Sequence, residues 1–156
     1  MRSMCGLVMG ATLLVAVSAA PSPSVARNLA DLICRGAASS SAAELPDELI
    51  PAAAKALEMD AQFIRGGGYY RCSGGRLLVC AVGANLNCGK ADTDRNPDSV
   101  IAYCIRNPND PSIPLAVTGH ATVYSWKCVG GAPQLDGDGM KVDADGYVAV
   151  NWRELR

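Results

Sequence analysis

Hydrophobic positions along the chain predict helices in its first part and short strands in its second. Apolar residues recur at helical spacing within 27–35, and a second helical pattern covers 46–59. Between them, 36–43 is a run of small and polar residues typical of a flexible connector. Three consecutive glycines at 66–68 end this helical part.

Two residues indicate where these helices begin. Asn28 is a suitable N-cap for the first, because a short polar side chain can accept hydrogen bonds from the first turn. Pro51 is tolerated only in the first turn of a helix, so the second helix is predicted to start near it.

Strand patterns begin at Tyr69. The runs 69–72 and 76–82 are joined by Ser-Gly-Gly, a strong hairpin signal. The same construction recurs near the other end of the chain: 70–75 and 126–131 both run aromatic, basic, cysteine, any residue, two glycines. This echo is either a coincidence in a glycine-rich chain or the mark of two related hairpins in one small sheet.

The remaining C-terminal pattern predicts a helix, a long strand and a closing hairpin. The helix covers 96–106, with Asn96 as its cap and Pro97 in its first position. A loop at 108–114 leads to a strand over 115–128, and a hairpin over 141–152 closes the chain. The predicted fold class is therefore α+β, with N-terminal helices packed on a small antiparallel sheet.

The start of the chain is typical of an export signal. Arg2 precedes an apolar run at 7–17 that is too short to span a bilayer, and cleavage is expected after about Ala19 or Ala26. The alternative is a buried N-terminal helix. We expect 1–26 to be the signal, 27–66 a helical segment and 67–156 a cysteine-rich α+β core that forms one domain with it.

Cysteine content agrees with export. Cys5 lies in the signal, and six cysteines remain in the mature chain: Cys34, Cys72, Cys80, Cys88, Cys104 and Cys128. An even set in an exported chain predicts a disulfide framework and a periplasmic or secreted location. Many connectivities are possible, and we prefer Cys88 with Cys104, because that bond would tie a polar loop to the following helix.

Charge narrows the range of partners. Of the 14 basic and 15 acidic residues, only Arg2 lies in the signal, so the mature chain has 13 basic and 15 acidic residues. Nucleic acid and anionic membrane surfaces attract basic fields, so neither is expected as a partner. We also expect no stable membrane insertion of the mature chain.

The segment 83–95 is a polar loop with several candidate ligand-binding side chains. They are Asn85, Asn87, Lys90, Asp92, Asp94 and Arg95. The alternative is a structural loop pinned by Cys88. The segment does not match a phosphate-binding loop, because the spacing from Gly83 to Gly89-Lys90 is one residue too long and Ala91 occupies the position of the Ser or Thr that would ligate magnesium. The acidic run 136–146 does not fit a calcium loop, so no metal and no cofactor are expected.

Three further side chains lie on the predicted strand 115–128. Tyr124 and Trp126, beside Tyr69 and Tyr70, could line a ligand surface on one sheet face, although packing in the core is the alternative. His120 is the one histidine and therefore a candidate general base, with Asp92 or Asp94 as its acid partner. It has no companion motif, which favours a structural role.

Several motifs together resemble a family of small, exported, cysteine-rich proteins of alpha-proteobacteria whose function is unknown. They are Tyr-Arg-Cys with Gly-Gly, Gly-Ala-Asn-Leu-Asn-Cys ending at Cys88, Lys-Ala-Asp-Thr at 90–93, Val-Thr-Gly-His at 117–120, Trp-x-Cys at 126–128 and Asn-Trp at 151–152. The resemblance implies no mechanism. A fainter likeness is to periplasmic inhibitors of lysozyme, carried by the aromatic-x-Cys strand before a turn.

These patterns lead to three functional hypotheses. The first is a non-catalytic binding or inhibitor-like module of the cell envelope, whose partner is an unknown protein or small-molecule ligand. The second is a small hydrolase that uses His120 with a nearby acid. The third is a structural or stress-related envelope protein without a defined ligand. We expect binding in preference to catalysis.

Overall fold

The computed structural model describes residues 23–83 and 85–156, so most of the predicted export signal lies outside the described residues. The described helices are α1 (Pro23–Cys34), α2 (Ile50–Leu57), α3 (Ala61–Gly67), α4 (Asp98–Arg106) and α5 (Leu115–Thr118), with the 3-10 helices η1 (Asp47–Leu49) and η2 (Ala149–Asn151). The strands are β1 (Ala43–Glu44), β2 (Gly68–Ser73), β3 (Arg76–Ala81), β4 (Trp126–Val129), β5 (Ala132–Leu135) and β6 (Arg153–Glu154). None of the described helices is long and apolar enough to cross a membrane.

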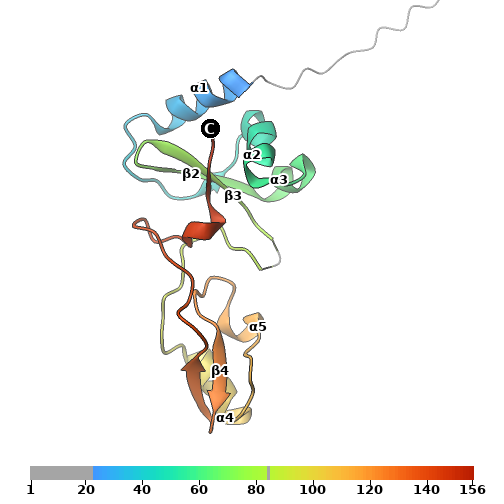
Figure 1. The fold of residues 1–156 in the computed structure, drawn as a ribbon, viewed down its shortest axis with the longest axis vertical. Helices are drawn as coiled ribbons and strands as arrows, with labels where there is room; N and C mark the ends of the chain where they lie inside the picture. Colours follow the sequence, from blue (N-terminus) through green and yellow to red (C-terminus); the bar gives the residue numbers. More distant parts are fainter. Residues whose placement is uncertain (1–22, 84) are drawn as a thin grey trace, which may run out of the picture.

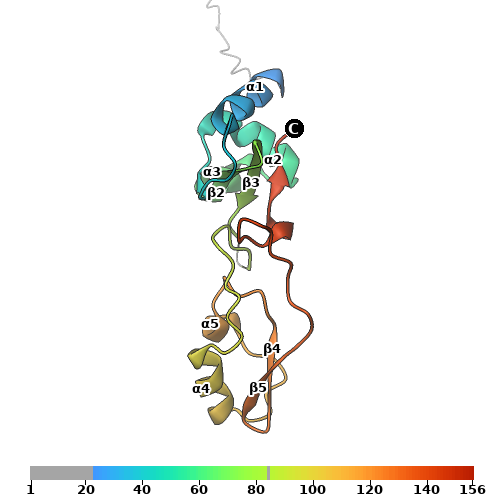
Figure 2. The ribbon, with the colours of Figure 1, turned by 90° about the vertical axis from the view of Figure 1, so that its left-hand side faces the viewer.

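Two antiparallel sheets lie at opposite ends of an elongated molecule (Figures 1 and 2). The first has the order β1-β2-β3-β6 and carries α1, α2 and α3. The second is the hairpin β4-β5, beside α4 and α5. Extended chain connects the two ends, and β6 returns from the second end to the edge of the first sheet. The predicted α+β class with disulfides is confirmed.

The main hydrophobic core lies between the first sheet and its helices. Side chains alternate along β2 and β3, and one face presents Tyr70, Cys72, Leu77 and Val79 to a cluster that includes Leu49, Ala53 and Ile64. Leu49 and Val79 are fully buried. Burial of a side chain of this size stabilises the fold by about 1.5–3 kcal/mol, so these contacts hold the helices to the sheet.

The opposite face of the same sheet is also covered, but by loops. It presents Tyr69, Leu78 and Cys80 to a second cluster that contains Cys88, Tyr147 and Trp152. The segments around 86–90 and 143–152 therefore form a third layer. Burial on both faces explains why β3 is almost continuously apolar and does not alternate with polar residues.

Each of the six described cysteines forms a disulfide: Cys34–Cys72, Cys80–Cys88 and Cys104–Cys128. The preferred pairing of Cys88 with Cys104 is therefore wrong. Cys88 packs against the loop-covered face of the first sheet, whereas Cys104 belongs to the core of the second. The loop that contains Cys88 folds back on its own strand before the chain reaches α4.

The two echoing hairpins both form, but in separate sheets, which corrects the expectation of one small sheet. In both, the paired glycines have positive φ: 57° and 75° at Gly74 and Gly75, 60° and 84° at Gly130 and Gly131. That conformation is unfavourable for residues with a side chain, which explains the Gly-Gly pairs.

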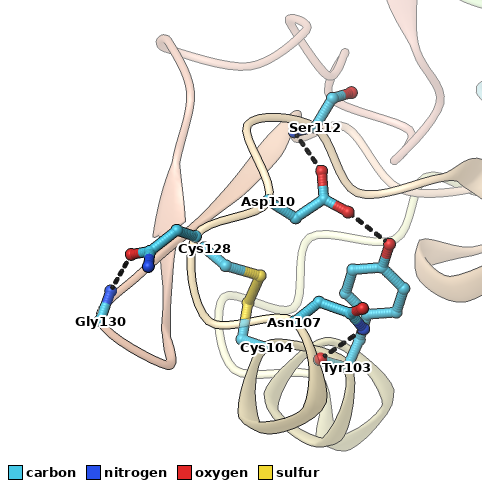
Figure 3. The surroundings of a disulfide bond; sticks show 8 residues. Tyr103, Cys104, Asn107, Asp110, Ser112, Cys128 and Gly130 are labelled. Atoms are coloured by element: carbon cyan, nitrogen blue, oxygen red, sulfur yellow. Dashed lines mark hydrogen bonds between the residues drawn. A yellow bond between two sulfur atoms is a disulfide. The ribbon is translucent and has the colours of Figure 1, made fainter.

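The segment after each helix cysteine also repeats its contacts with the hairpin, and Figure 3 shows the surroundings of the second bond, Cys104–Cys128. After Cys34, the carbonyls of residues 37 and 38 accept hydrogen bonds from Gly75 and Gly74, and the Ser40 hydroxyl accepts one from the Cys72 N–H. After Cys104, residues 108 and 109 accept from Gly131 and Gly130, and the carbonyl of Asp110 accepts from the Cys128 N–H. Both ends of the molecule are thus built from the same unit: a helix, a disulfide and a hairpin. This supports related hairpins over coincidence.

The boundaries of the N-terminal helices differ from the prediction. The first begins at Pro23, so Asn28 lies inside it and is not its cap. The second pattern divides into η1 and α2, and Pro51 lies in the first turn of α2 as expected. Helix α3 was not predicted; the Asp60 side chain caps it by accepting a hydrogen bond from the Gln62 N–H at 2.7 Å.

Helix α3 runs directly into β2 at Gly68. A Cβ at that position would lie 2.6 Å from the carbonyl oxygen of Ile64, so only glycine permits this junction. In α4, Pro97 occupies the cap position without a side-chain hydrogen bond, so the predicted cap at Asn96 is one residue too early.

The predicted long strand 115–128 is wrong. Its first residues form α5 after Pro114, Gly119 ends that helix with φ 81°, and only Trp126–Val129 is a strand. In the closing segment, the turn at 143–146 is present, with the Gly146 N–H bonded to the Asp143 carbonyl at 3.0 Å. The two arms of the predicted hairpin do meet, through an antiparallel bridge between Val142 and Val148, but the second arm is not a continuous strand, because η2 interrupts it and β6 begins only at Arg153.

The disulfides should differ in their effect on stability. Replacing Cys34 and Cys72 together by alanine is expected to cost about 1.4 kcal/mol more unfolding free energy than replacing Cys80 and Cys88, because the bonds close loops with separations of 38 and 8 residues. Urea denaturation of the two double variants without reductant measures the difference. The reverse ranking, or a peptide map that joins Cys88 to Cys104, would contradict the connectivity.

Candidate functional site

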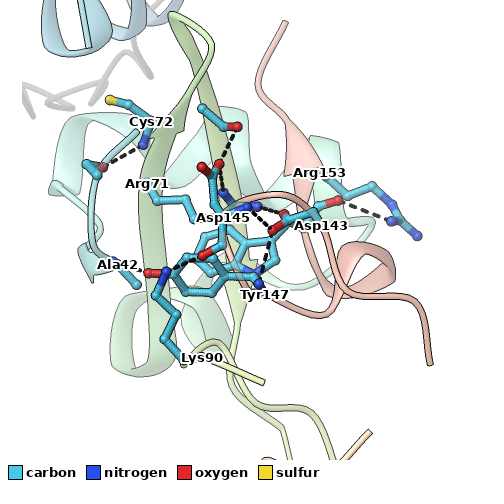
Figure 4. A network of polar contacts seen from close by, with 11 residues as sticks. Ala42, Arg71, Cys72, Lys90, Asp143, Asp145, Tyr147 and Arg153 are labelled. Atoms are coloured by element: carbon cyan, nitrogen blue, oxygen red, sulfur yellow. Dashed lines mark hydrogen bonds and ion pairs between the residues drawn. The ribbon is translucent and has the colours of Figure 1, made fainter. Parts of the chain in front are cut away.

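The region between the two sheets is organised around one buried cation, Arg71 on β2 (Figure 4). Its side chain is 1% exposed and forms ion pairs with two different carboxylates, Asp143 and Asp145; the Nη1–Oδ2 distance to Asp145 is 2.9 Å. Its guanidinium also lies over two aromatic rings, 4.3 Å from the centroid of Tyr147 and 4.8 Å from that of Trp152. The charge is thus paired and covered on one side by aromatic rings, which makes its burial tolerable.

The two aspartates lie in the tight turn at 143–146, and local hydrogen bonds orient their carboxylates toward Arg71. The carboxylate of Asp143 accepts hydrogen bonds at 3.0 Å from the backbone N–H groups of Asp145 and Tyr147. The Ser73 hydroxyl donates to Asp145 at 2.5 Å. Hydrogen bonds from Ser73 and Ser39, and then the neighbouring Arg71, hold the pKa of Asp145 below its ordinary value.

Lys90 closes this cluster from the outside. Its ammonium group donates to the backbone carbonyl of Asp145 and lies 4.2 Å from the centroid of the Tyr147 ring. The Tyr147 hydroxyl in turn accepts a hydrogen bond from the Ala42 N–H at 3.0 Å. Lys90 was predicted as a ligand-binding residue, and the structure places it in the internal contacts between the polar loop and the turn at 143–146.

Other predicted loop residues also form local contacts. The side-chain oxygens of Asn87, Asp92 and Asp94 each accept a hydrogen bond from the backbone N–H two residues later, at 2.8–2.9 Å. This is the geometry of an Asx turn. Asn85 is exposed. The backbone of Asp92 pairs with 121–123, which connects the loop to the segment that leads to β4.

The aromatic candidates lie at the second sheet. Trp126 is 4% exposed and Tyr124 packs against it edge to face, with ring centroids 5.9 Å apart. The guanidinium of Arg95 lies 5.0 Å from the centre of the Tyr124 ring. Trp126 therefore packs in the core, and the structure brings Arg95 and Tyr124 together but leaves the other loop candidates elsewhere.

His120 lies exposed just after α5. Within the described part of the chain, its side chain forms no hydrogen bond or ion pair with a carboxylate or a hydroxyl. The neighbouring residue Ala121 does contact the loop, because its carbonyl accepts a hydrogen bond from the Asp92 N–H at 2.7 Å. No group of three metal-ligating side chains is present among the described residues.

A pocket of about 310 Å³ lies where the polar loop meets the first sheet. It is lined by Ala42, Tyr69, Val82, Asn87, Cys88 and Gly89. The Asn87 side-chain oxygen is occupied by the Gly89 N–H, while its Nδ2 atom and the Tyr69 hydroxyl have no hydrogen-bond partner among the described residues. The pocket walls carry no charged side chain, and the Cys80–Cys88 disulfide fixes one of them.

The sequence indicated Asn87 as a candidate and placed Tyr69 beside Tyr124 and Trp126 on one sheet face, whereas the structure places Tyr69 in the pocket with Asn87 and Trp126 in the other sheet. The Arg71 network was missed, because the sequence does not distinguish Arg71 from Lys127, which has the same place in the echoing motif and remains partly exposed. Comparison of the chain with protein-family models, curated proteins and solved structures gave no match. The two resemblances therefore stay predictions.

Removing the buried cation should destabilise the fold strongly. Arg71→Met is expected to cost about 3–5 kcal/mol of unfolding free energy, because Asp143 and Asp145 then lose their shared counter-ion inside the structure. The control is Arg65→Met, which breaks the exposed pair with Asp47 and should cost about 0–1 kcal/mol. Urea denaturation of both variants gives the comparison. Equally small losses of unfolding free energy in the two variants would show that the buried ion pairs of Arg71 do not stabilise the fold.

Asp145 should contribute to the acid sensitivity of the fold. Its folded-state pKa is lowered, so the stability it supplies is complete above its unfolded pKa of about 3.9 and is lost as pH falls from there through the lower folded value. Asp145→Asn is expected to be less stable at pH 7 and to lose less stability between pH 5 and pH 2. Denaturation curves at several pH values test this, with the exposed Asp136→Asn as control. An unchanged acid slope in Asp145→Asn would contradict it.

Proposed function

We propose that this protein is an exported, non-catalytic binding module whose ligand occupies the pocket beside Tyr69 and Asn87. The observation that carries the proposal is that two residues lining the pocket, Asn87 and Tyr69, each have a polar group without a hydrogen-bond partner among the described residues, the Asn87 amide nitrogen and the Tyr69 hydroxyl. Most other polar candidates of the loop form internal contacts, whereas these two groups can form hydrogen bonds with a ligand. Pockets that bind small molecules combine apolar walls with a few such polar groups.

The lining chemistry favours a neutral ligand with one apolar face. Ala42 and Val82 supply apolar surface, Tyr69 supplies an aromatic ring, and no charged side chain is present to attract an ion. A volume of about 310 Å³ is at the small end for ligand pockets, which limits the bound part to about one ring. A sugar ring fits these requirements, because it presents C–H groups on one face and hydroxyl or amide groups at its edge.

Two contacts hold the pocket walls in place without a ligand. The Cys80–Cys88 disulfide fixes one wall, and the Asn151 side chain donates to the Asn87 carbonyl at 3.0 Å and holds the loop from behind. A preformed pocket avoids the entropic cost of ordering a loop upon binding. Three disulfides and the absence of a membrane-spanning helix among the described residues are consistent with a domain that works outside the cytoplasm.

The hydrolase hypothesis stays a prediction without support from a contact at His120. The residue is exposed, and within the described ranges no acid orients it. A histidine that acts as a general base lies within hydrogen-bond distance of the proton that it removes, and a neighbouring acid commonly orients its imidazole ring. We therefore place the function in binding.

Binding in the pocket can be tested with N-acetylglucosamine as the probe, since it has both an apolar ring face and an amide. Titration into the ¹⁵N-labelled protein should shift the amide signals around Tyr69, Val82 and Asn87. Asn87→Asp keeps the oxygen that accepts from Gly89 but removes the free donor, and should weaken binding about tenfold, as expected for the loss of one buried hydrogen bond. Tyr69→Leu should weaken it as well.

Asn109→Asp is the matched control, because the Asn109 oxygen likewise accepts a hydrogen bond from a glycine N–H, Gly130, but at the other sheet. It should leave binding unchanged. The proposal is wrong if N-acetylglucosamine, glucose and galactose all leave the pocket signals in place. Cleavage of a chitin trisaccharide by the wild-type protein that disappears in His120→Ala would instead support the hydrolase.

A further inference from the structure

A second cavity lies at the far edge of the first sheet, between α2 and β6. Its volume is about 450 Å³, and its walls are Ala52, Lys55, Ala56, Arg153, Glu154 and Arg156. The two alanines belong to one helix face and form a small apolar wall. The remaining lining residues are charged, so this groove differs in kind from the neutral pocket beside Tyr69.

Positive charge exceeds negative charge in and around the groove. Its lining includes three cations, Lys55, Arg153 and Arg156, and one acidic residue, Glu154. Arg76, on the neighbouring strand β3, forms an ion pair with Glu154, with Nη1 3.2 Å from Oε2. Glu154 also pairs with Arg156, at 3.7 Å. One carboxylate is thus shared by two of four cations, in a chain whose net charge is −1. The cations repel one another, and a bound anion would relieve that repulsion.

The donors in the groove are only partly used. The Lys55 ammonium group forms no ion pair or hydrogen bond within the part of the chain that the structure describes. Arg153 places one nitrogen, Nη1, against the carbonyls of Val150 at 2.8 Å and Trp152 at 3.4 Å, and Figure 4 shows its side chain directed away from the Arg71 cluster. Those bonds anchor the guanidinium and leave its other N–H groups available.

We propose that this groove binds a phosphate group. A phosphate ester carries up to two negative charges and three acceptor oxygens, which matches several separate cationic donors better than a carboxylate does. Arginine side chains recognise phosphate through paired N–H groups, and lysine adds a mobile point charge. Arg153 is the anchored donor, Lys55 and Arg156 close on the anion from either side, and the carbon skeleton of the ester rests on Ala52 and Ala56.

The phosphate could belong to a small soluble ester or to a lipid headgroup, and the two sources share the same chemistry. The groove does not depend on the neutral pocket, which is lined by a separate set of residues. Loss of one function therefore does not remove the other.

The test uses the full chain with three probes: inorganic phosphate, glycerol 3-phosphate and, as the uncharged control, glycerol. Heteronuclear NMR titration should show binding of both phosphates with shifts at α2 and β6, and no effect of glycerol. The double variant Lys55→Gln/Arg156→Gln should bind phosphate at least about tenfold more weakly, since about 1.4 kcal/mol of charge-assisted hydrogen bonding is lost. Higher salt should weaken the wild-type interaction.

Lys127→Gln is the matched control, because Lys127 is a surface cation with its own partner, Asp136, at 3.4 Å. Co-sedimentation with vesicles that contain phosphatidic acid, whose headgroup is a phosphate monoester like glycerol 3-phosphate, is compared with vesicles of phosphatidylcholine alone. Binding to the former that is lost in the double variant indicates a headgroup, and binding of glycerol 3-phosphate alone indicates a soluble ester. The proposal is overturned if no phosphate probe binds. It is also overturned if the double variant binds phosphate as tightly as Lys127→Gln and the wild-type protein do.

Discussion

The fold depends on the ion pairs between the buried guanidinium of Arg71 and two aspartates, Asp143 and Asp145. Arg71 is 1% exposed on a strand whose other face already contacts the helices, so its partners must come from a distant part of the chain. Asp143 and Asp145 lie 72 and 74 residues further on, beyond the whole second sheet. The chain therefore has to return to the first sheet after forming the second, and the ion pairs, the aromatic cover and Lys90 hold it there. The Arg71 Nε atom has no hydrogen-bond partner among the described residues, so the cation is stabilised by its two ion pairs and by the rings of Tyr147 and Trp152.

Features that depend on neighbouring residues could be predicted from the sequence, and features that depend on distant ones could not. The hairpin at Gly74-Gly75 and the helix that contains Cys104 have local signals, a glycine pair and an apolar stripe after a proline, and both are present. The pairing of Cys88 was predicted wrongly because the loop's direction depends on packing against Tyr147 and Trp152, far away in the chain. The strand over 115–128 was wrong because composition alone does not reveal the turn that the Thr122 hydroxyl forms by accepting from the Tyr124 N–H.

The candidate site shows a similar limit. Asparagine and aspartate in a loop indicate either ligand binding or turns, since the same side-chain oxygens serve both. In 85–95 the oxygens of Asn87, Asp92 and Asp94 cap turns, and the sequence has no feature that separates this use from the other. It could indicate Asn87 and, separately, Tyr69 as candidates. It could not show that they line one pocket, which depends on β2 presenting Tyr69 on the loop-covered face of the sheet.

Both proposed sites depend on one short segment, η2 with the start of β6. Trp152 packs on Arg71 and Tyr147. The two residues that flank it belong to different proposed sites: Asn151 donates a hydrogen bond to the Asn87 carbonyl beside the neutral pocket, and Arg153 lines the basic groove. Because the same tryptophan fixes both neighbours, the buried Arg71 positions residues of two surfaces that it does not touch. The contacts of Arg71 and Trp152 thus hold in place the residues of both surfaces proposed to bind ligands, which would lower the entropic cost of binding there.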